Sequence, residues 1–260
     1  MKSENKFERL DKFLSNNGFG TRKDVKRLIH SGRVKVNESI QMLDDFHIYP
    51  GKDEIFVDEE KIPFPCDVVF MLNKPKGYVC STVSDSHPVV MELIKAEDNL
   101  KYPGGKISMV GRLDVDTEGL LLLTSDGLLN HRLTSPKWQI EKEYLVFLRD
   151  KISSETKNEY AEKALKGMHL KAEGKHEECD CKSARINWLN EEEYNAESCC
   201  TIIITEGKFH EIKRIFSALG NEVVYLKRIR MNKLELDKSL KSGEYRKLNE
   251  AELLLLEKDI

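Results

Sequence analysis

Near the start of the chain, apolar residues recur at helical spacing. Leu10, Phe13 and Leu14 predict a helix over residues 7–17 with one buried face. A break at residues 18–20 separates it from a second helix, which Thr21 would cap at its N-terminus and Gly32 would follow. Its apolar residues lie on one face, with four cations on the opposite face, and residues 33–37 then alternate as a short basic strand.

Short apolar strands dominate the rest of the chain. The clearest are Val68–Leu72, Leu120–Thr124, Tyr144–Leu148 and Cys200–Thr205. Helical patterns interrupt them at residues 153–166 and 209–219. Because strands and helices do not alternate strictly, the order predicts an α+β fold with a mixed or antiparallel sheet, not a doubly wound one.

Two prolines, Pro63 and Pro65, divide these patterns, since proline stops regular structure. We therefore expect a small domain over residues 1–62, a linker over 63–66 and a larger domain over 67–260. The length of 260 residues suits such a pair.

The overall charge hides a local asymmetry. The chain has 42 basic and 45 acidic residues, a net charge of −3. Residues 1–37, however, hold ten basic and four acidic residues, which gives about +6. No apolar run approaches a membrane span, and the first residues lack the apolar core of a secretory signal. We expect a cytoplasmic protein with no membrane partner.

The cysteines raise the question of a metal site. Cys179, Cys181, Cys199 and Cys200 lie in the same region as His176. Their spacing departs from that of zinc knuckles, and adjacent cysteines are poorly placed to chelate one ion. Reduced thiols are the expected state, with no metal.

The most informative segment is the polar loop over residues 111–119. Arg112, Asp114, Asp116 and Thr117 crowd it, and glycines at both ends permit tight turns ahead of a buried strand. Taken alone, this pattern is also typical of a charged surface turn. The pair Asp114 and Asp116 also occurs in magnesium-dependent phosphate chemistry, but no second acidic cluster supports a metal here.

The loop resembles the active-site motif of pseudouridine synthases of the RsuA type, Gly-Arg-Leu-Asp-x-x-Thr-x-Gly-Leu-Leu, without a gap. The resemblance implies that Asp114 is the catalytic aspartate. The segment Lys142–Tyr144 matches the Lys-x-Tyr motif, which would place Tyr144 against the target base. Residues 206–214 match a third motif, in which Lys213 would be the cation beside Asp114, with Arg214 as the alternative.

Other segments also match the family, and one of them favours its small-subunit ribosomal members. Residues 70–79 look like the strand and turn that open the catalytic domain, and residues 78–82 with His87-Pro88 are similar to the small-subunit ribosomal enzyme. In the third motif the chain has Phe209 and Glu211 where the family more often has Tyr and Gln. His210 would ordinarily make a local hydrogen bond, and the family chemistry requires no histidine.

Residues 9–37 resemble the S4 RNA-binding module, whose second helix presents basic residues to RNA. Like charges four residues apart on a helix repel, and phosphates of a polyanion would compensate for this. The expected RNA contacts are Arg22, Lys23, Lys26, Arg27 and Arg33 in this module, with Lys74, Arg112 and Arg214 in the larger domain.

These matches imply an enzyme that isomerises a specific uridine of small-subunit (16S) ribosomal RNA. The reaction moves the uracil from N1 to C5 without net redox change, so no cofactor is expected. Asp114 would act as nucleophile or as base. The partner would be ribosomal RNA or the assembling 30S particle, bound by a monomer. The alternatives are a large-subunit (23S) target, a non-catalytic RNA-binding assembly factor, and a magnesium-dependent phosphohydrolase, which EDTA would inhibit.

Overall fold

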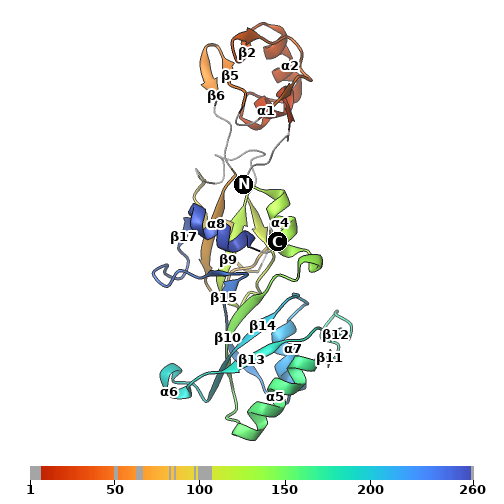
Figure 1. Cartoon of the computed structure of the whole chain (residues 1–260), viewed down its shortest axis with the longest axis vertical. Coiled ribbons are helices and arrows are strands. Elements are labelled where there is room, and N and C mark those ends of the chain that lie inside the picture. Colours follow the sequence, from red (N-terminus) through yellow and green to blue (C-terminus); the bar gives the residue numbers. More distant parts are fainter. Residues whose placement is uncertain are drawn as a thin grey trace. The chain divides into compact units, whose positions relative to one another are not determined.

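The computed structural model in Figure 1 describes residues 7–49, 52–62, 67–81, 83–84, 86–96, 98 and 107–258. The chain divides into two compact units, the first built mainly from residues up to Asp67 and the second from Val68–Lys95 and Ser108–Ile260. The expected linker at 63–66 lies outside the described residues, as does Thr82 of the motif after Tyr78.

Two helices form one side of the first unit, α1 (Leu10–Asn16) and α2 (Arg22–His30). The Thr21 side chain and Asp24 form a capping box at the start of α2, which confirms the predicted cap. The prediction of a helix from residue 7 was wrong at its start. There, β1 (Glu8–Arg9) pairs with β4 (His47–Ile48), a partner 38 residues further on that local periodicity does not reveal.

The sheet of the first unit has the order β3–β2–β5–β6. Its strands are β3 (Ser39–Ile40), β2 (Val34–Val36), β5 (Ile55–Val57) and β6 (Glu60–Ile62). The apolar faces of both helices pack on this sheet in one core, which includes Leu10, Phe13, Leu14, Val25, Ile29, Val34 and Ile55. The core accounts for the helical spacing seen in the sequence.

The second unit is built on a nine-stranded mixed sheet, so the predicted α+β class is confirmed. Seven strands follow the order β13–β14–β10–β15–β9–β7–β17, with β16 beside β15 and β8 beside β9. They are β13 (Arg185–Trp188), β14 (Ser198–Ile204), β10 (Lys142–Leu148), β15 (Val223–Met231), β9 (Glu118–Thr124), β7 (Val69–Lys74), β17 (Tyr245–Lys247), β16 (Leu234–Glu235) and β8 (Ser108–Val110). Among the described strands, the pair β15 and β9 is the parallel one; the others are antiparallel.

Strands β7 and β9 form the buried centre of this sheet. Every residue of β7 is buried, as is β9 from Gly119 onward. A strand covered on both faces carries a continuous apolar run, which is why this part of the sheet was visible in the sequence. The long β15 was missed because basic residues interrupt its apolar ones.

The helices of the second unit include two that were predicted, α5 (Ser154–Lys166) and α7 (Glu211–Ala218). The sequence Ser125-Asp126-Gly127 after β9 is typical of a turn, but it contains the start of α4 (Gly127–Thr134), since the Asp126 side chain accepts hydrogen bonds from the backbone of Leu128 and Leu129. The short α6 (Glu191–Tyr194) and the C-terminal α8 (Glu250–Glu257) were not predicted.

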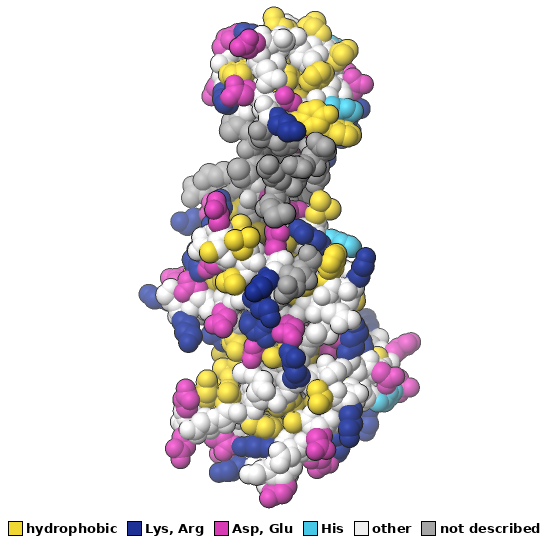
Figure 2. All heavy atoms as spheres, in the orientation of Figure 1, with side chains coloured by type: hydrophobic (Ala, Val, Ile, Leu, Met, Phe, Trp, Pro, Cys, Tyr) yellow, Lys and Arg dark blue, Asp and Glu magenta, His cyan; other side chains and the backbone are white. Residues whose placement is uncertain are grey.

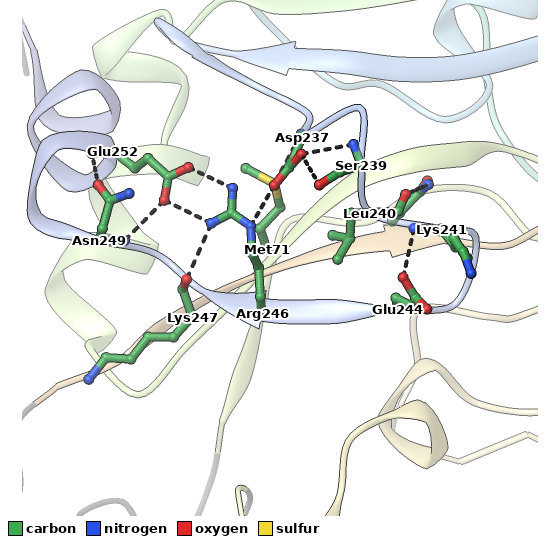
Figure 3. Close-up of polar contacts among 11 residues, drawn as sticks. Met71, Asp237, Ser239, Leu240, Lys241, Glu244, Arg246, Lys247, Asn249 and Glu252 are labelled. Atoms are coloured by element: carbon green, nitrogen blue, oxygen red, sulfur yellow. Dashed lines mark hydrogen bonds and ion pairs between the residues drawn. The ribbon is translucent and has the colours of Figure 1, made fainter.

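Arg246 on β17 fastens the C-terminal segment to the sheet. Figure 3 shows its guanidinium between two carboxylates, Asp237 at 2.7 Å and Glu252 of α8 at 2.7 Å. The hydrogen bonds of Ser239 and the Arg246 charge together lower the pKa of Asp237 to about 2. Because β17 pairs with β7, this network supports the strand that ends at Lys74.

Basic and acidic side chains are interspersed over the face of the second unit visible in Figure 2. Within the described ranges, no helix has the length and apolar character needed to cross a membrane.

Candidate active site

The loop that carries Asp114 is held between two glycines with positive φ, +72° at Gly111 and +98° at Gly119. A Cβ at Gly119 would lie 2.2 Å from the backbone oxygen of Arg228 on the parallel strand β15, so only glycine fits there. The Gly77 amide donates to the Val115 oxygen at 2.7 Å and fixes the loop against the turn after β7.

Lys74, at the end of β7, lies under this loop. Its side chain is fully buried, and Nζ donates to the backbone oxygens of Thr117 at 2.8 Å and of Asp114 and Pro75 at 3.1 Å. Burial lowers the pKa of Lys74, although nearby carboxylates oppose the change. The expected RNA contact by Lys74 was therefore wrong, because the side chain supports the loop from within the protein.

A cavity of about 330 Å³ opens above the loop. Asp114, whose side chain is 33 % exposed, lines it together with Arg112, Tyr144 and Lys213. The remaining lining residues come from the segment after β7 (Val79, Cys80, Ser81), the same loop (Leu113, Val115, Thr117), the segment around the start of α7 (Gly207, Lys208, Phe209, His210, Glu211, Ile212) and strands β14 and β15 (Ile204, Leu226). The three motifs thus meet at one cavity.

Tyr144 lies on β10 between β14 and β15, in register with Arg228 of β15. The tyrosine is 7 % exposed. Burial raises the pKa of its hydroxyl, and the adjacent Arg228 guanidinium offsets part of the rise. Arg228 is itself buried and donates from Nε to the Leu120 oxygen at 2.6 Å. The neutral phenol therefore lies beside a buried cation that the sequence had not suggested.

Lys213 does not pair with Asp114. Its Nζ donates to both carboxylate oxygens of Asp116, at 2.6 and 2.7 Å. Burial alone would raise the pKa of Asp116, but the hydrogen bond and charge of Lys213 lower it overall. The expectation that Lys213 is the cation beside Asp114 is thus not met in this structure, although both side chains line the cavity.

Arg214, the alternative cation, points elsewhere. It is 7 % exposed, and its guanidinium donates to the backbone oxygens of Leu170, Lys171 and Glu177. These oxygens belong to the tongue, the hairpin over residues 168–181 formed by β11 (Met168–Leu170) and β12 (Cys179–Cys181). The predicted RNA contact by Arg214 was wrong, because its donors are used to hold the tongue on α7.

Glu211 is the residue that replaces the more usual glutamine. It is buried at the start of α7, and its carboxylate accepts the Lys208 amide at 2.8 Å. Burial, together with the neighbouring Glu206, raises the pKa of Glu211 to about 7. At neutral pH this carboxyl therefore holds a proton part of the time, as a glutamine amide always does.

His210 and Glu173 are site residues that the sequence analysis did not assign. The His210 ring lies beside Asp114, and its Nδ1 donates a hydrogen bond to Oε1 of Glu173 on the tongue. His210 was recognised as a local hydrogen-bonding residue, but no signal identified Glu173, which lies in an irregular, polar stretch.

In the first unit, the four cations of α2 are exposed as expected. Three of the predicted RNA contacts have carboxylate partners within the unit: Lys26 with Asp44 at 2.6 Å, Arg33 with Asp58 at 2.7 Å and, more loosely, Arg27 with Asp24 at 3.9 Å. Arg22, Lys23 and Arg27 remain the least engaged, and the Arg27 side chain is 71 % exposed.

The four cysteines that raised the question of a metal site lie on two different strands. Cys199 and Cys200 are buried in β14, and Cys179 and Cys181 lie on β12. Over the described residues, no three His, Cys, Asp or Glu side chains form a group that could hold a metal ion.

Comparison with known proteins identifies both parts of the chain. Residues 68–218 match the RNA pseudouridylate synthase family, and residues 8–41 match the S4 domain. An uncharacterized RNA pseudouridine synthase of Aquifex aeolicus is 40 % identical over 246 residues, 94 % of each chain. The ribosomal small subunit pseudouridine synthase A of Haemophilus influenzae is 38 % identical over 94 % of this chain and 97 % of its own. A pseudouridylate synthase crystal structure, 37 % identical, covers 95 % of this chain and 99 % of its own with a TM-score of 0.62.

Proposed function

Since this chain belongs to the RNA pseudouridylate synthase family and is an RNA pseudouridine synthase, we propose that it isomerises one uridine of small-subunit ribosomal RNA and that Asp114 carries the chemistry. The observation that carries the proposal is the cavity at which Asp114, Tyr144 and Lys213 meet. Its volume of about 330 Å³ is at the lower end of the about 300–1,000 Å³ typical of ligand sites. That size suits one nucleoside taken out of the RNA stack.

Asp114 attacks or deprotonates the ribose of that nucleoside. The N1–C1′ bond breaks, the uracil turns over and a C5–C1′ bond forms; the C5 proton is then lost while N1 takes up a proton, which gives pseudouridine as an isomer of uridine. The carboxylate acts either as a nucleophile at the sugar or as a base toward a sugar proton. Tyr144, neutral and buried, lies against the base and assists the proton removal. Lys74 keeps the Asp114 backbone in place from below.

RNA is held by basic side chains of both units. Arg112 is exposed at the cavity and contacts the strand from which the uridine is extruded, whose unstacking costs a few kcal/mol. In the S4 domain, Arg22, Lys23 and Arg27 contact phosphates, because exposed cations with few internal partners gain most from counterion release. Lys26 and Arg33 contribute after leaving their carboxylate partners.

The small subunit is the proposed target for two reasons. The Haemophilus influenzae relative, named for that subunit, is similar over nearly the whole chain. Residues 78–81 and His87-Pro88 also carry the pattern of the small-subunit enzyme. Large-subunit RNA is the alternative target.

Mapping of pseudouridine in ribosomal RNA from cells with and without the gene tests the proposal. We expect one small-subunit position to lose its modification on deletion and to regain it when the purified protein acts on small-subunit transcripts or assembling particles. Loss at a large-subunit position would reassign the target. No lost position, combined with tight RNA binding, would favour a non-catalytic assembly role.

A further inference from the structure

The ring of His210 lies between two carboxyl groups from different parts of the second unit. Nδ1 is 2.9 Å from Glu173 Oε1 on the tongue, and Nε2 is 3.9 Å from Asp114 Oδ1 on the loop before β9. Among the described residues, no other basic side chain comes within 4.0 Å of the Asp114 carboxylate. Lys213, the expected cation, instead pairs with Asp116.

The position of this ring is fixed from several sides. His210 has φ +48°, a left-handed conformation at the start of α7 that directs its side chain away from the helix. Its ring stacks on Phe209 at 3.7 Å, and Phe209 stacks in turn on His176 of the tongue at 3.7 Å. Arg214 fastens the tongue to the same helix. A ring held in this way cannot turn freely between its two partners.

Glu173 supplies the charge that orients the ring. One of its oxygens contacts Nδ1, while the other, Oε2, is buried with no hydrogen-bond partner among the described residues. A carboxylate at Nδ1 keeps a proton on that nitrogen and directs Nε2 toward Asp114. A protonated ring places its positive charge beside the Asp114 carboxylate, with Nε2 at 3.9 Å from Oδ1.

We propose that His210, oriented by Glu173, is a positioning residue that places its ring charge beside the Asp114 carboxylate and keeps this group directed into the cavity. The proposal rests on the proposed function, because it assigns His210 a role in the same reaction. His210 does not touch the substrate and acts through Asp114. The charged and titratable groups that face it are Asp114 and Asp116 of the loop, Glu173 and His176 of the tongue, and Lys213 of α7.

Three variants separate this role from a structural one. His210→Asn tolerates the left-handed backbone and removes the ring charge. Glu173→Gln lies on the partly exposed tongue, retains an oxygen acceptor and removes the orienting charge. His169→Asn is the matched control, because it removes another imidazole of the tongue, whose partners are Asp180 and Glu178 instead of Asp114. Single-turnover pseudouridine formation is measured for each from pH 5.5 to 8.5, with RNA affinity and thermal unfolding measured in parallel.

We expect His210→Asn to slow single turnover about 10- to 100-fold, with RNA affinity unchanged. The shape of its pH–rate profile should change as well, because the ring charge beside Asp114 is removed. Glu173→Gln should act in the same direction with a smaller effect, and His169→Asn should match the wild type.

Identical profiles for the wild type, His210→Asn and Glu173→Gln would overturn the assignment. So would an equal loss in all three variants that follows weakened RNA binding, because that pattern belongs to a structural role of the tongue. If His210→Asn does not fold, the Glu173→Gln profile decides alone. No product from the wild-type protein would instead overturn the proposed function, and the assignment with it.

Discussion

Two carboxyl groups near the cavity, those of Asp116 and Glu211, have opposite pKa shifts because their partners differ. Lys213 holds the pKa of Asp116 below its ordinary value despite burial. Glu211 lies deeper and beside another acidic group, Glu206, so burial raises its pKa to about 7. Asp116 and Glu211 thus respond to different pH ranges, and Glu211 titrates near neutrality.

This shift predicts a pH-dependent stability for Glu211→Gln. The folded protein keeps the Glu211 proton up to about pH 7, whereas the unfolded chain loses it near the ordinary value of 4.5. The free energy of unfolding therefore falls as the pH rises between these values, and the loss is complete above pH 7. The neutral amide avoids this loss, so the variant should be more stable by on the order of 2 kcal/mol at pH 8.5 and nearly equal at pH 5.

Urea unfolding at both pH values measures this difference. Glu193→Gln, an exposed carboxyl on α6, is the control and should change stability little at either pH. A Glu211→Gln curve that runs parallel to the wild-type curve across this range would contradict the assigned shift.

At the scale of elements, the end of β7 and the start of β9 support the loop that carries Asp114. Lys74 joins them through three backbone oxygens, and it pairs in register with Gly119. A buried cation that satisfies several carbonyls cannot be removed without leaving them unpaired. The strand ends and the loop therefore form one structural unit.

Lys74→Met is expected to destabilise the fold by about 2 kcal/mol, because lost hydrogen bonds outweigh the relief of burying a charge. It should also slow catalysis by at least about tenfold through displacement of Asp114. Thermal unfolding and single-turnover rates measure the two effects. Lys76→Met, in the same turn but exposed, should leave both unchanged. A Lys74→Met protein as active as the wild type would show that the loop needs no such support.

Elements were predictable from the sequence where local spacing determines them. The helix α2 carries its cap and its apolar face within eleven residues, and β9 is a continuous apolar run. The strand β1 and the long β15 were not predicted, because their partners lie far along the chain, β1 consists of charged residues, and basic residues interrupt the apolar ones of β15. The helix α4 was missed because Asp126-Gly127 is equally typical of a turn and of a cap.

At the scale of the whole molecule, the site residues also divide into those that a local motif indicates and those whose partners depend on the fold. Asp114 could be proposed as the catalytic residue from the sequence because its motif is contiguous. The pairing of Lys213 with Asp116, and of His210 with Glu173, joins segments 97 and 37 residues apart, so spacing alone did not reveal it. The burial of Lys74 and Arg214 likewise depends on the loop and tongue that cover them. Chemistry was predictable from the sequence, whereas the partner of each charge required the fold.

For the S4 domain, the exposed cations predict a salt effect on RNA binding. Lys23→Ala combined with Arg27→Ala should weaken binding and reduce the slope of log K against log salt concentration by about 1.4 to 1.8, the release of two counterions. Lys238→Ala with Lys241→Ala removes the same charge from exposed positions of the second unit and should leave the slope unchanged. Equal slopes for the wild type and the S4 variant would remove α2 from the RNA interface.

Pseudouridine formation by the wild type and Asp114→Asn, compared on small-subunit ribosomal RNA transcripts and particles, tests the central claim most directly. The substitution keeps the size of the side chain and removes its charge, so RNA affinity measured alongside should not change. We expect product from the wild type and none from Asp114→Asn. Equal product from both proteins would contradict the claim that Asp114 carries the chemistry.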